Sequence, residues 1–186
     1  MKNRGKELRI AGLLIGLSII YFIIAMMLAE ALYPGYSISN NYISDLGVGP
    51  SALLFNASII FLGVLLLIGA YFYERGSKQK VFSTLLAIAA VAAICVGVFN
   101  ENFGAIHEIV SAIVFISGGV AALYFAVREK SVIRYPSLVL GLTGLSATVL
   151  SEASVYLGIG PGGMERMIVY PILLWGVLFA GRLLAM

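Results

Sequence analysis

The residues best suited to chemistry in this sequence are a single histidine and several carboxylates near the ends of apolar segments. His107 and Glu108 open one such segment, and Ser111 follows at a spacing that places all three along one helix edge. A histidine can act as general base, metal ligand or pH sensor. The plainer interpretation is a histidine at head-group level that pairs with a nearby acid, and the helix dipole is a sufficient structural reason for Glu108.

Glu152 is predicted to be the deepest acid, about one turn inside the end of its segment. Thr148, Ser151, Glu152 and Tyr156 share one helical face. A charged side chain costs about 2.5–3.5 kcal/mol at mid-membrane, so this face should point into the protein and not toward lipid. Two interpretations stay open: Glu152 is a general base, or it is a structural glutamate hydrogen-bonded to its neighbours.

A second polar group is expected in two loops. Ser44 and Asp45 belong to an Ile-Ser-Asp-Leu-Gly stretch, where Asp45 is either a site residue or the carboxylate of a tight turn bonded to backbone amides. Asn100 and Glu101 follow an apolar segment directly, and Glu101 could be an exposed surface acid. We include all four in the candidate site.

Arg166 is the only basic residue predicted on the outer side. One interpretation makes it a counter-ion for Glu152, Glu108 or Glu101. The other makes it a planar fork for a phosphate or carboxylate of a ligand. The sequence favours the counter-ion, because acids are abundant on that side.

The elements that must position these residues are membrane-spanning helices. Of the 186 residues, 61% are hydrophobic and only 11% are charged, and the mean hydropathy is +1.02. An apolar run of about twenty residues crosses a bilayer. The sequence therefore predicts an all-α, polytopic membrane protein, a single six-helix bundle over residues 1–186, with spans at about 10–33, 51–73, 81–99, 105–127, 135–157 and 164–185.

The basic residues predict the orientation of this bundle. Arg166 apart, every lysine and arginine falls at one end, whereas most acids fall at the other. Basic residues gather on the cytoplasmic side, so both termini are expected in the cytoplasm and the protein in the cell membrane. The inner residues are Lys2, Arg4, Lys6, Arg9, Arg75, Lys78, Lys80, Arg128, Lys130, Arg134 and Arg182, with Glu7, Glu74 and Glu129; the outer acids are Glu30, Asp45, Glu101, Glu108, Glu152 and Glu165.

Other features limit the chemistry. The first outer loop, about residues 33–50, is long for so compact a chain, which is typical of a functional or lid-like loop. One histidine excludes a metal site with several histidines, while a carboxylate-rich site for Ca²⁺, Mg²⁺ or Mn²⁺ remains open. Cys95 is the only cysteine, so no intrachain disulfide forms. No nucleic-acid partner is expected, and the oligomeric state is left open.

Several short stretches carry a resemblance to a known family. They are Ile43 to Gly47 with Pro50, Leu54-Phe55-Asn56, Gly97 to Asn100 with His107, and Gly163 to Arg166 with Trp175. Through them the chain resembles a prokaryotic family of six-span membrane proteins of unknown function and, more distantly, FRAG-type and autophagy-modulator membrane proteins. The resemblance implies six helices and marks Asp45, His107 and Arg166 as family positions, but it implies no reaction. The chain also resembles intramembrane ceramidase-type hydrolases, but these use several histidines and this chain has one. Their mechanism is therefore not expected here.

These observations lead to one leading hypothesis and two alternatives. The leading hypothesis is an outward-facing polar pocket, roofed by the first outer loop, that binds or processes a lipid head group or small amphiphile, with or without a divalent cation. In an enzyme, a hydrolase or transferase, His107 or Glu152 would be the base and Arg166 would hold an anionic group. The alternatives are a proton- or cation-linked transporter and a structural or signalling bundle.

Overall fold

The computed structural model describes residues 2–186, and within them it contains six α-helices, two short 3₁₀ helices and no β-strand. The predicted all-α class is therefore confirmed. In chain order the elements are α1 (Lys2–Leu32), η1 (Ser44–Gly47), α2 (Ala52–Ser77), α3 (Lys80–Val98), η2 (Glu101–Phe103), α4 (Ala105–Arg128), α5 (Arg134–Glu152) and α6 (Gly160–Leu184).

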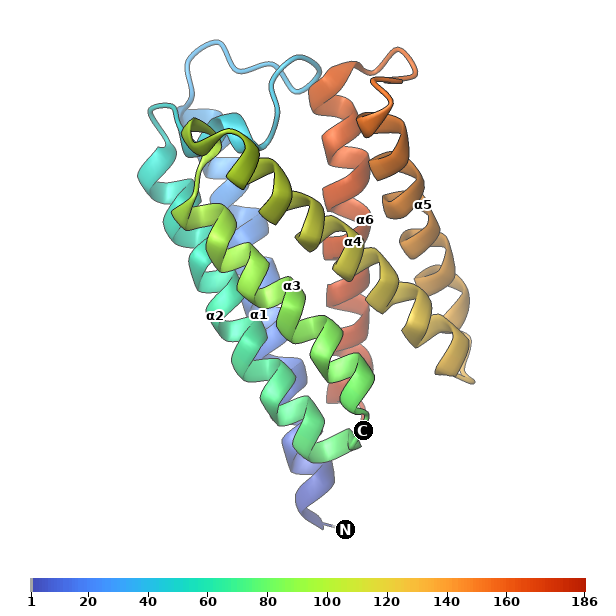
Figure 1. The fold of residues 1–186 in the computed structure, drawn as a ribbon. Helices are drawn as coiled ribbons and strands as arrows, with labels where there is room; N and C mark the ends of the chain where they lie inside the picture. Colours follow the sequence, from blue (N-terminus) through green and yellow to red (C-terminus); the bar gives the residue numbers. More distant parts are fainter. Residues whose placement is uncertain (1) are drawn as a thin grey trace.

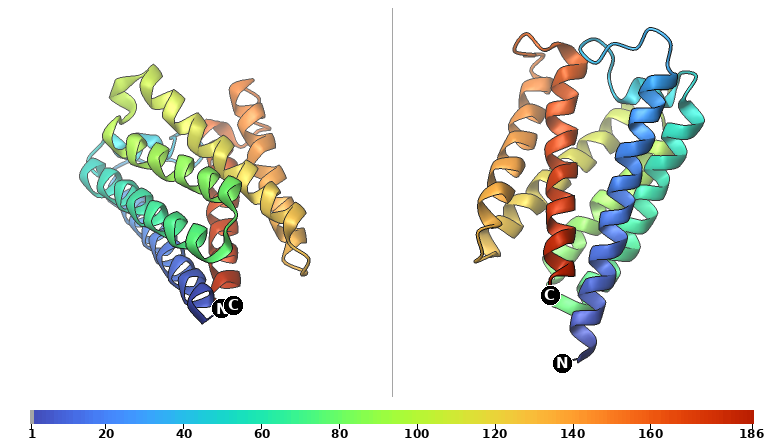
Figure 2. Two further views of the ribbon diagram at one scale, coloured as in Figure 1. Left: turned by 60° about the horizontal axis from the view of Figure 1, so that its bottom comes forward. Right: turned by 180° about the vertical axis from the view of Figure 1, so that it is seen from behind.

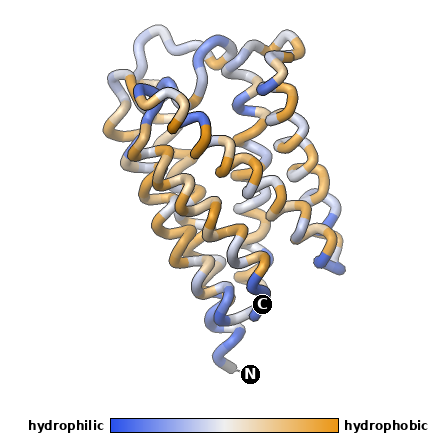
Figure 3. The backbone as a smooth tube through the Cα atoms, in the orientation of Figure 1, coloured by the Kyte–Doolittle hydropathy of each residue, from blue (hydrophilic) through white to orange (hydrophobic). Residues whose placement is uncertain are grey.

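Five helices are long and apolar enough to cross a membrane: α1, α2, α3, α4 and α6. Their shafts are hydrophobic, and hydrophilic residues gather at the ends (Figure 3). Helix α5 is less hydrophobic than the other five, because several small or polar residues interrupt its apolar sequence. They are Gly141, Thr143, Gly144, Ser146 and Thr148. The chain is thus an integral membrane protein with five clear spans, and the crossing by α5 stays a prediction.

The helices form a closed ring in which each packs against its chain neighbours and α1 packs against α6. The two termini lie at the same end of the ring (Figure 1). Small residues permit the close approaches: a Cβ on Gly12 of α1 would lie 2.8 Å from the carbonyl oxygen of Ala180 on α6. Likewise, a Cβ on Gly97 of α3 would lie 2.7 Å from the carbonyl oxygen of Asn56 on α2. Such contacts hold helices together in lipid.

Helices α4 and α5 meet at the end that holds the termini and diverge toward the other end (Figure 1). Their connection is fixed by Glu129, which accepts hydrogen bonds from the backbone N–H groups of Lys130 and Ser131 and from Arg182 Nε of α6 at 3.1 Å. Burial works to raise the pKa of Glu129, but the hydrogen bonds from Ser131 and Arg182 outweigh it and lower that pKa. The two helices therefore form a V that opens toward the opposite end (Figure 1).

The loop of residues 33–51 arches between the ends of α1 and α6 that lie away from the termini (Figure 2). Two of the hydrogen bonds that dock it involve Ser39: Gly162 N donates to the carbonyl of Ser39 at 2.9 Å, and Ser39 Oγ donates to the carbonyl of Ile159 at 2.8 Å. The loop therefore has a fixed place above the start of α6, at the end where the V opens.

Candidate functional site

A groove of about 700 Å³ lies at the open end of the V. Its walls come from α4, from the end of α5, from the start of α6 and from three connections at this end: the loop of residues 33–51, the α3–α4 connection and the α5–α6 connection. The polar members are Tyr42, Ser44, Glu101, His107, Glu108, Ser111, Thr148, Ser151, Glu152, Ser154, Tyr156 and Glu165. Five predicted site residues are thus brought into one hollow: Ser44, Glu101, His107, Glu108 and Glu152.

Below the groove lies a smaller, apolar cavity of about 80 Å³ inside the bundle. Its lining is mostly aliphatic and aromatic, from α1, α2, α3, α4 and α6. The two spaces share part of their walls. The shared residues are Ser44, His107, Ser111, Phe115 and Glu165. A polar hollow therefore borders directly on an apolar one.

His107 stands at this border and is only 6% exposed. Its Nδ1 lies 2.8 Å from the carbonyl oxygen of Phe99, which can only accept, so Nδ1 carries a proton. In the neutral ring the proton-free nitrogen is then Nε2, which lies 3.4 Å from Ser111 Oγ. The backbone of the α3–η2 connection thus fixes the tautomer and leaves Nε2 available as a base.

Ser111 differs from five other hydroxyl residues inside the helices. Ser18, Ser58, Ser117, Ser137 and Thr148 each donate to a backbone carbonyl three or four residues earlier. Among the described residues, the only hydrogen-bond partner of Ser111 Oγ is His107 Nε2. A hydroxyl beside a base that a third group orients is the arrangement of an activated nucleophile.

Glu165 is the most buried carboxylate at this end, with 9% of its surface exposed. Its Oε2 accepts a hydrogen bond from Ile43 N of the loop. No lysine, arginine or histidine nitrogen of residues 2–186 lies within 4.0 Å of it. It lines both the groove and the apolar cavity.

The expectation that Glu152 is the deepest acid is wrong. Helix α5 ends at Glu152, and the side chain is exposed. The chain then turns sharply, with left-handed backbone at Ser154 and Leu157, so the predicted span 135–157 ran one turn too far into apolar loop residues. Glu152 and the exposed Glu108 form the rim of the groove.

Glu101 is the loop acid that lies in the roof of the groove. Ser44 Oγ donates to Glu101 Oε1 at 3.0 Å, and burial together with the nearby charge of Asp45 raises the pKa of Glu101. Tyr42 lies close to Tyr156, and this neighbouring hydroxyl together with burial raises the pKa of Tyr42 to about 12. The loop of residues 33–51 and the α5–α6 connection therefore approach each other beside the groove.

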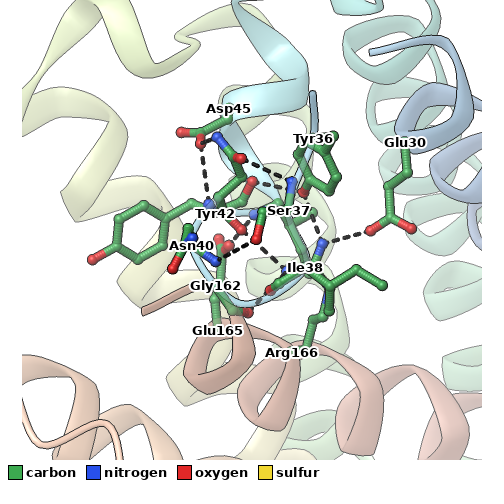
Figure 4. Close-up of polar contacts among 12 residues, drawn as sticks. Glu30, Tyr36, Ser37, Ile38, Asn40, Tyr42, Asp45, Gly162, Glu165 and Arg166 are labelled. Carbon is green, nitrogen blue, oxygen red and sulfur yellow. Dashed lines mark hydrogen bonds and ion pairs between the residues drawn. The ribbon is translucent and has the colours of Figure 1, made fainter. Parts of the chain in front are cut away.

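Asp45 and Asn100 do not line the groove. Asp45 Oδ2 accepts hydrogen bonds from Asn41 Nδ2 at 2.7 Å and from Tyr42 N at 3.1 Å, which is the tight turn considered from the sequence (Figure 4). Asn100 Oδ1 accepts from Asn102 N at 3.2 Å and caps η2. Both residues shape the loops that carry the groove residues.

Arg166 points away from the groove, toward α1 and the loop. Its NH2 group donates to Glu30 Oε1 at 2.6 Å and to Tyr36 Oη at 2.8 Å, and NH1 donates to the carbonyls of Ile38, Asn41 and Gly162 (Figure 4). It is a counter-ion, but for Glu30, not for the three acids considered from the sequence. Burial raises the pKa of Tyr36 to about 12 beside it, although the hydrogen bond from Arg166 works in the opposite direction.

Within residues 2–186, no three His, Cys, Asp or Glu side chains are grouped so that they could hold a metal ion. The carboxylate-rich cation site stays an expectation.

Sequence reasoning left Glu165 out of the site and put Arg166 in. Neighbouring positions on a helix point about 100° apart, so only one of the two could face the groove. In the structure Glu165 is three residues before Ile168, which also lines the groove, but the sequence alone does not show which face of α6 this is.

Comparison with known proteins gives one match. The model of the family described as "Protein of unknown function (DUF998)" covers residues 16–182. Searches of curated proteins and of solved structures found no match. The family match agrees with the predicted family of unknown function, whereas the FRAG-type likeness stays an expectation. The chain belongs to the DUF998 family of proteins of unknown function.

Proposed function

We propose that this protein binds a lipid or small amphiphile at the outward-facing surface of the cell membrane. The polar head of this molecule lies in the groove, and its apolar part is directed to the cavity. The observation that supports this is the shared wall of the two spaces, formed by Ser44, His107, Ser111, Phe115 and Glu165. A polar hollow beside an apolar one fits a molecule that is itself divided in this way.

The proposal includes the orientation. Helix α5 packs between α4 and α6, and it crosses the membrane with them. The end that holds the termini carries the basic residues, so it is cytoplasmic and the groove faces outward in the cell membrane.

The test is the lipid content of the purified protein. We expect protein in dodecyl maltoside to retain one tightly held amphiphile, detected by native mass spectrometry. Ala112 lines the groove, so Ala112→Phe narrows it and should remove this adduct. The matched control is Val120→Phe, because Val120 lies on α4 with 37% of its surface exposed. Identical adducts on both variants, with equal thermal stability, would rule the site out.

The contact between Ser111 and His107 favours a reaction as a second candidate. Ser111 Oγ would attack an ester carbonyl and give its proton to His107 Nε2. That proton then leaves with the alcohol, and water cleaves the acyl-serine. Hydrolysis of p-nitrophenyl octanoate by the protein in dodecyl maltoside tests this reaction. Ser111→Ala should abolish the hydrolysis, and Ser117→Ala should not. Equal rates of hydrolysis by the two variants would contradict the reaction and leave only the binding proposal.

A further inference from the structure

Resting on the amphiphile site proposed above, we infer that its head group is cationic, an amine or quaternary ammonium on an apolar chain. The sign of the charge in the groove supports this first. Four carboxylates line it, on Glu101, Glu108, Glu152 and Glu165, and its lining contains no lysine or arginine. An anionic head group would meet only like charge there.

The base that could offset part of this negative charge is engaged elsewhere. Arg166 follows Glu165 directly in the chain, but its guanidinium is held by Glu30, Tyr36 and three backbone carbonyls on the opposite side of α6. Drawing it into the groove would leave Glu30 without its ion pair. The groove therefore keeps its negative charge.

Glu165 is an independent indication of a missing cation. The residue is nine-tenths buried. Oε2 accepts a hydrogen bond from Ile43 N, but no lysine, arginine or histidine nitrogen of the described residues lies within 4.0 Å of the carboxylate. A buried carboxylate without a cationic partner is costly. It lies at the border between groove and cavity, where the head of an amphiphile with its chain in the cavity would sit.

Aromatic side chains add a second contact that suits the same ligand class. Tyr42, Phe115 and Tyr156 line the groove. Aromatic rings attract ammonium groups, most strongly where water is excluded. A bulky quaternary ammonium, which donates no hydrogen bond, is held by such walls together with the carboxylate.

The experiment is a binding titration with three probes of equal chain length. Protein in dodecyl maltoside at pH 8 is dialysed against radiolabelled octyltrimethylammonium, with octyl phosphate and octyl glucoside as competitors. We expect saturable binding of the cation that neither competitor displaces. Glu165→Gln should weaken it roughly tenfold or more, as expected for loss of a charged contact.

Two variants serve as controls. Glu74→Gln removes a carboxylate from the other end of the molecule, where Glu74 accepts from Ser83 Oγ at 2.8 Å, and it should leave the affinity unchanged. If Glu165→Gln lowers the thermal stability of the protein, Glu108→Gln is used in its place, because Glu108 is exposed on the rim of the groove. For Glu108→Gln we expect a smaller loss of affinity for the cation.

The outcomes separate this inference from the function on which it rests. Equal binding of all three probes, or tighter binding of octyl phosphate, overturns the cationic head group and leaves the amphiphile site standing. If no probe binds and Ala112→Phe retains the same lipid as the unaltered chain, both proposals fail.

Discussion

Arg166 joins three parts of the chain at the groove end of the protein. Its side chain is 6% exposed and joins α6 to α1 through Glu30 and to the loop through the carbonyls of Ile38 and Asn41. We expect Arg166→Met to destabilise the protein by about 3–5 kcal/mol, because it leaves a partly buried carboxylate unpaired. Thermal unfolding in neutral detergent measures this as a lower Tm.

The control for Arg166 is an exposed arginine without an ion pair. Arg134 is exposed at the start of α5, and no carboxylate of the described residues lies within 4.0 Å of its nitrogens, so Arg134→Met should leave Tm nearly unchanged. In the double variant Glu30→Gln with Arg166→Met, no charge is left unpaired, and part of the stability should return. If Arg166→Met had a normal Tm, the arginine would not be structural, and its role as a ligand-binding fork would regain support.

Part of the residue-level picture could be predicted from the sequence, and the limit is geometric. The roles of Asp45 and Asn100 depend on partners within four residues, so local turn chemistry anticipates them. Glu165 and Arg166 are adjacent but face different sides of α6, and their partners Ile43 and Glu30 are more than a hundred residues away. Only the packed bundle shows which of them reaches the groove.

Among the elements, the contact between the loop 33–51 and the start of α6 sets the roof of the groove. A Cβ on Gly162 would lie 2.0 Å from the carbonyl oxygen of Asn41 and 2.7 Å from that of Ile38. Both are backbone atoms, so the whole loop would have to move. We expect Gly162→Ala to cost about 1–3 kcal/mol, as overpacking does, and to increase proteolysis within the loop.

The same helix provides a matched control for this substitution. Gly181 of α6 has no atom within 4 Å of an added Cβ, so Gly181→Ala should be neutral or stabilise the helix by roughly 0.5–1 kcal/mol. Limited proteolysis and Tm of the two variants make the comparison. A Gly162→Ala protein as resistant to protease as the unaltered chain would show that the loop is not docked in this way.

The helices themselves were largely predictable, because long apolar runs allow few alternatives. The end of α5 was not. Val155 and Leu157 extend the apolar pattern past Glu152, yet the backbone at Ser154 and Leu157 is left-handed and ends the helix. Hydropathy does not register such a turn, and the depth of Glu152 was misjudged for that reason.

In the whole molecule, an aromatic cluster separates the groove and its cavity from the other end. Tyr73, Phe82, Phe125, Trp175 and Phe179 pack with ring centroids 5.0–6.3 Å apart. All five are buried. A proton- or cation-linked path would have to pass through this apolar layer, so the arrangement favours a binding site closed at its base over the transporter alternative.

The orientation of the whole bundle decides which membrane surface the groove faces, and single cysteines can test it. In a Cys95→Ala background, cysteine is placed at Asn102 or Val155 on the groove end, or at Lys130 on the other; all three positions are exposed. We expect a membrane-impermeant maleimide to label Asn102→Cys and Val155→Cys in intact cells, and Lys130→Cys only after permeabilisation. Because Lys130 and Val155 flank α5, equal labelling of these two would mean that α5 does not cross, and labelling of Lys130→Cys alone would reverse the orientation.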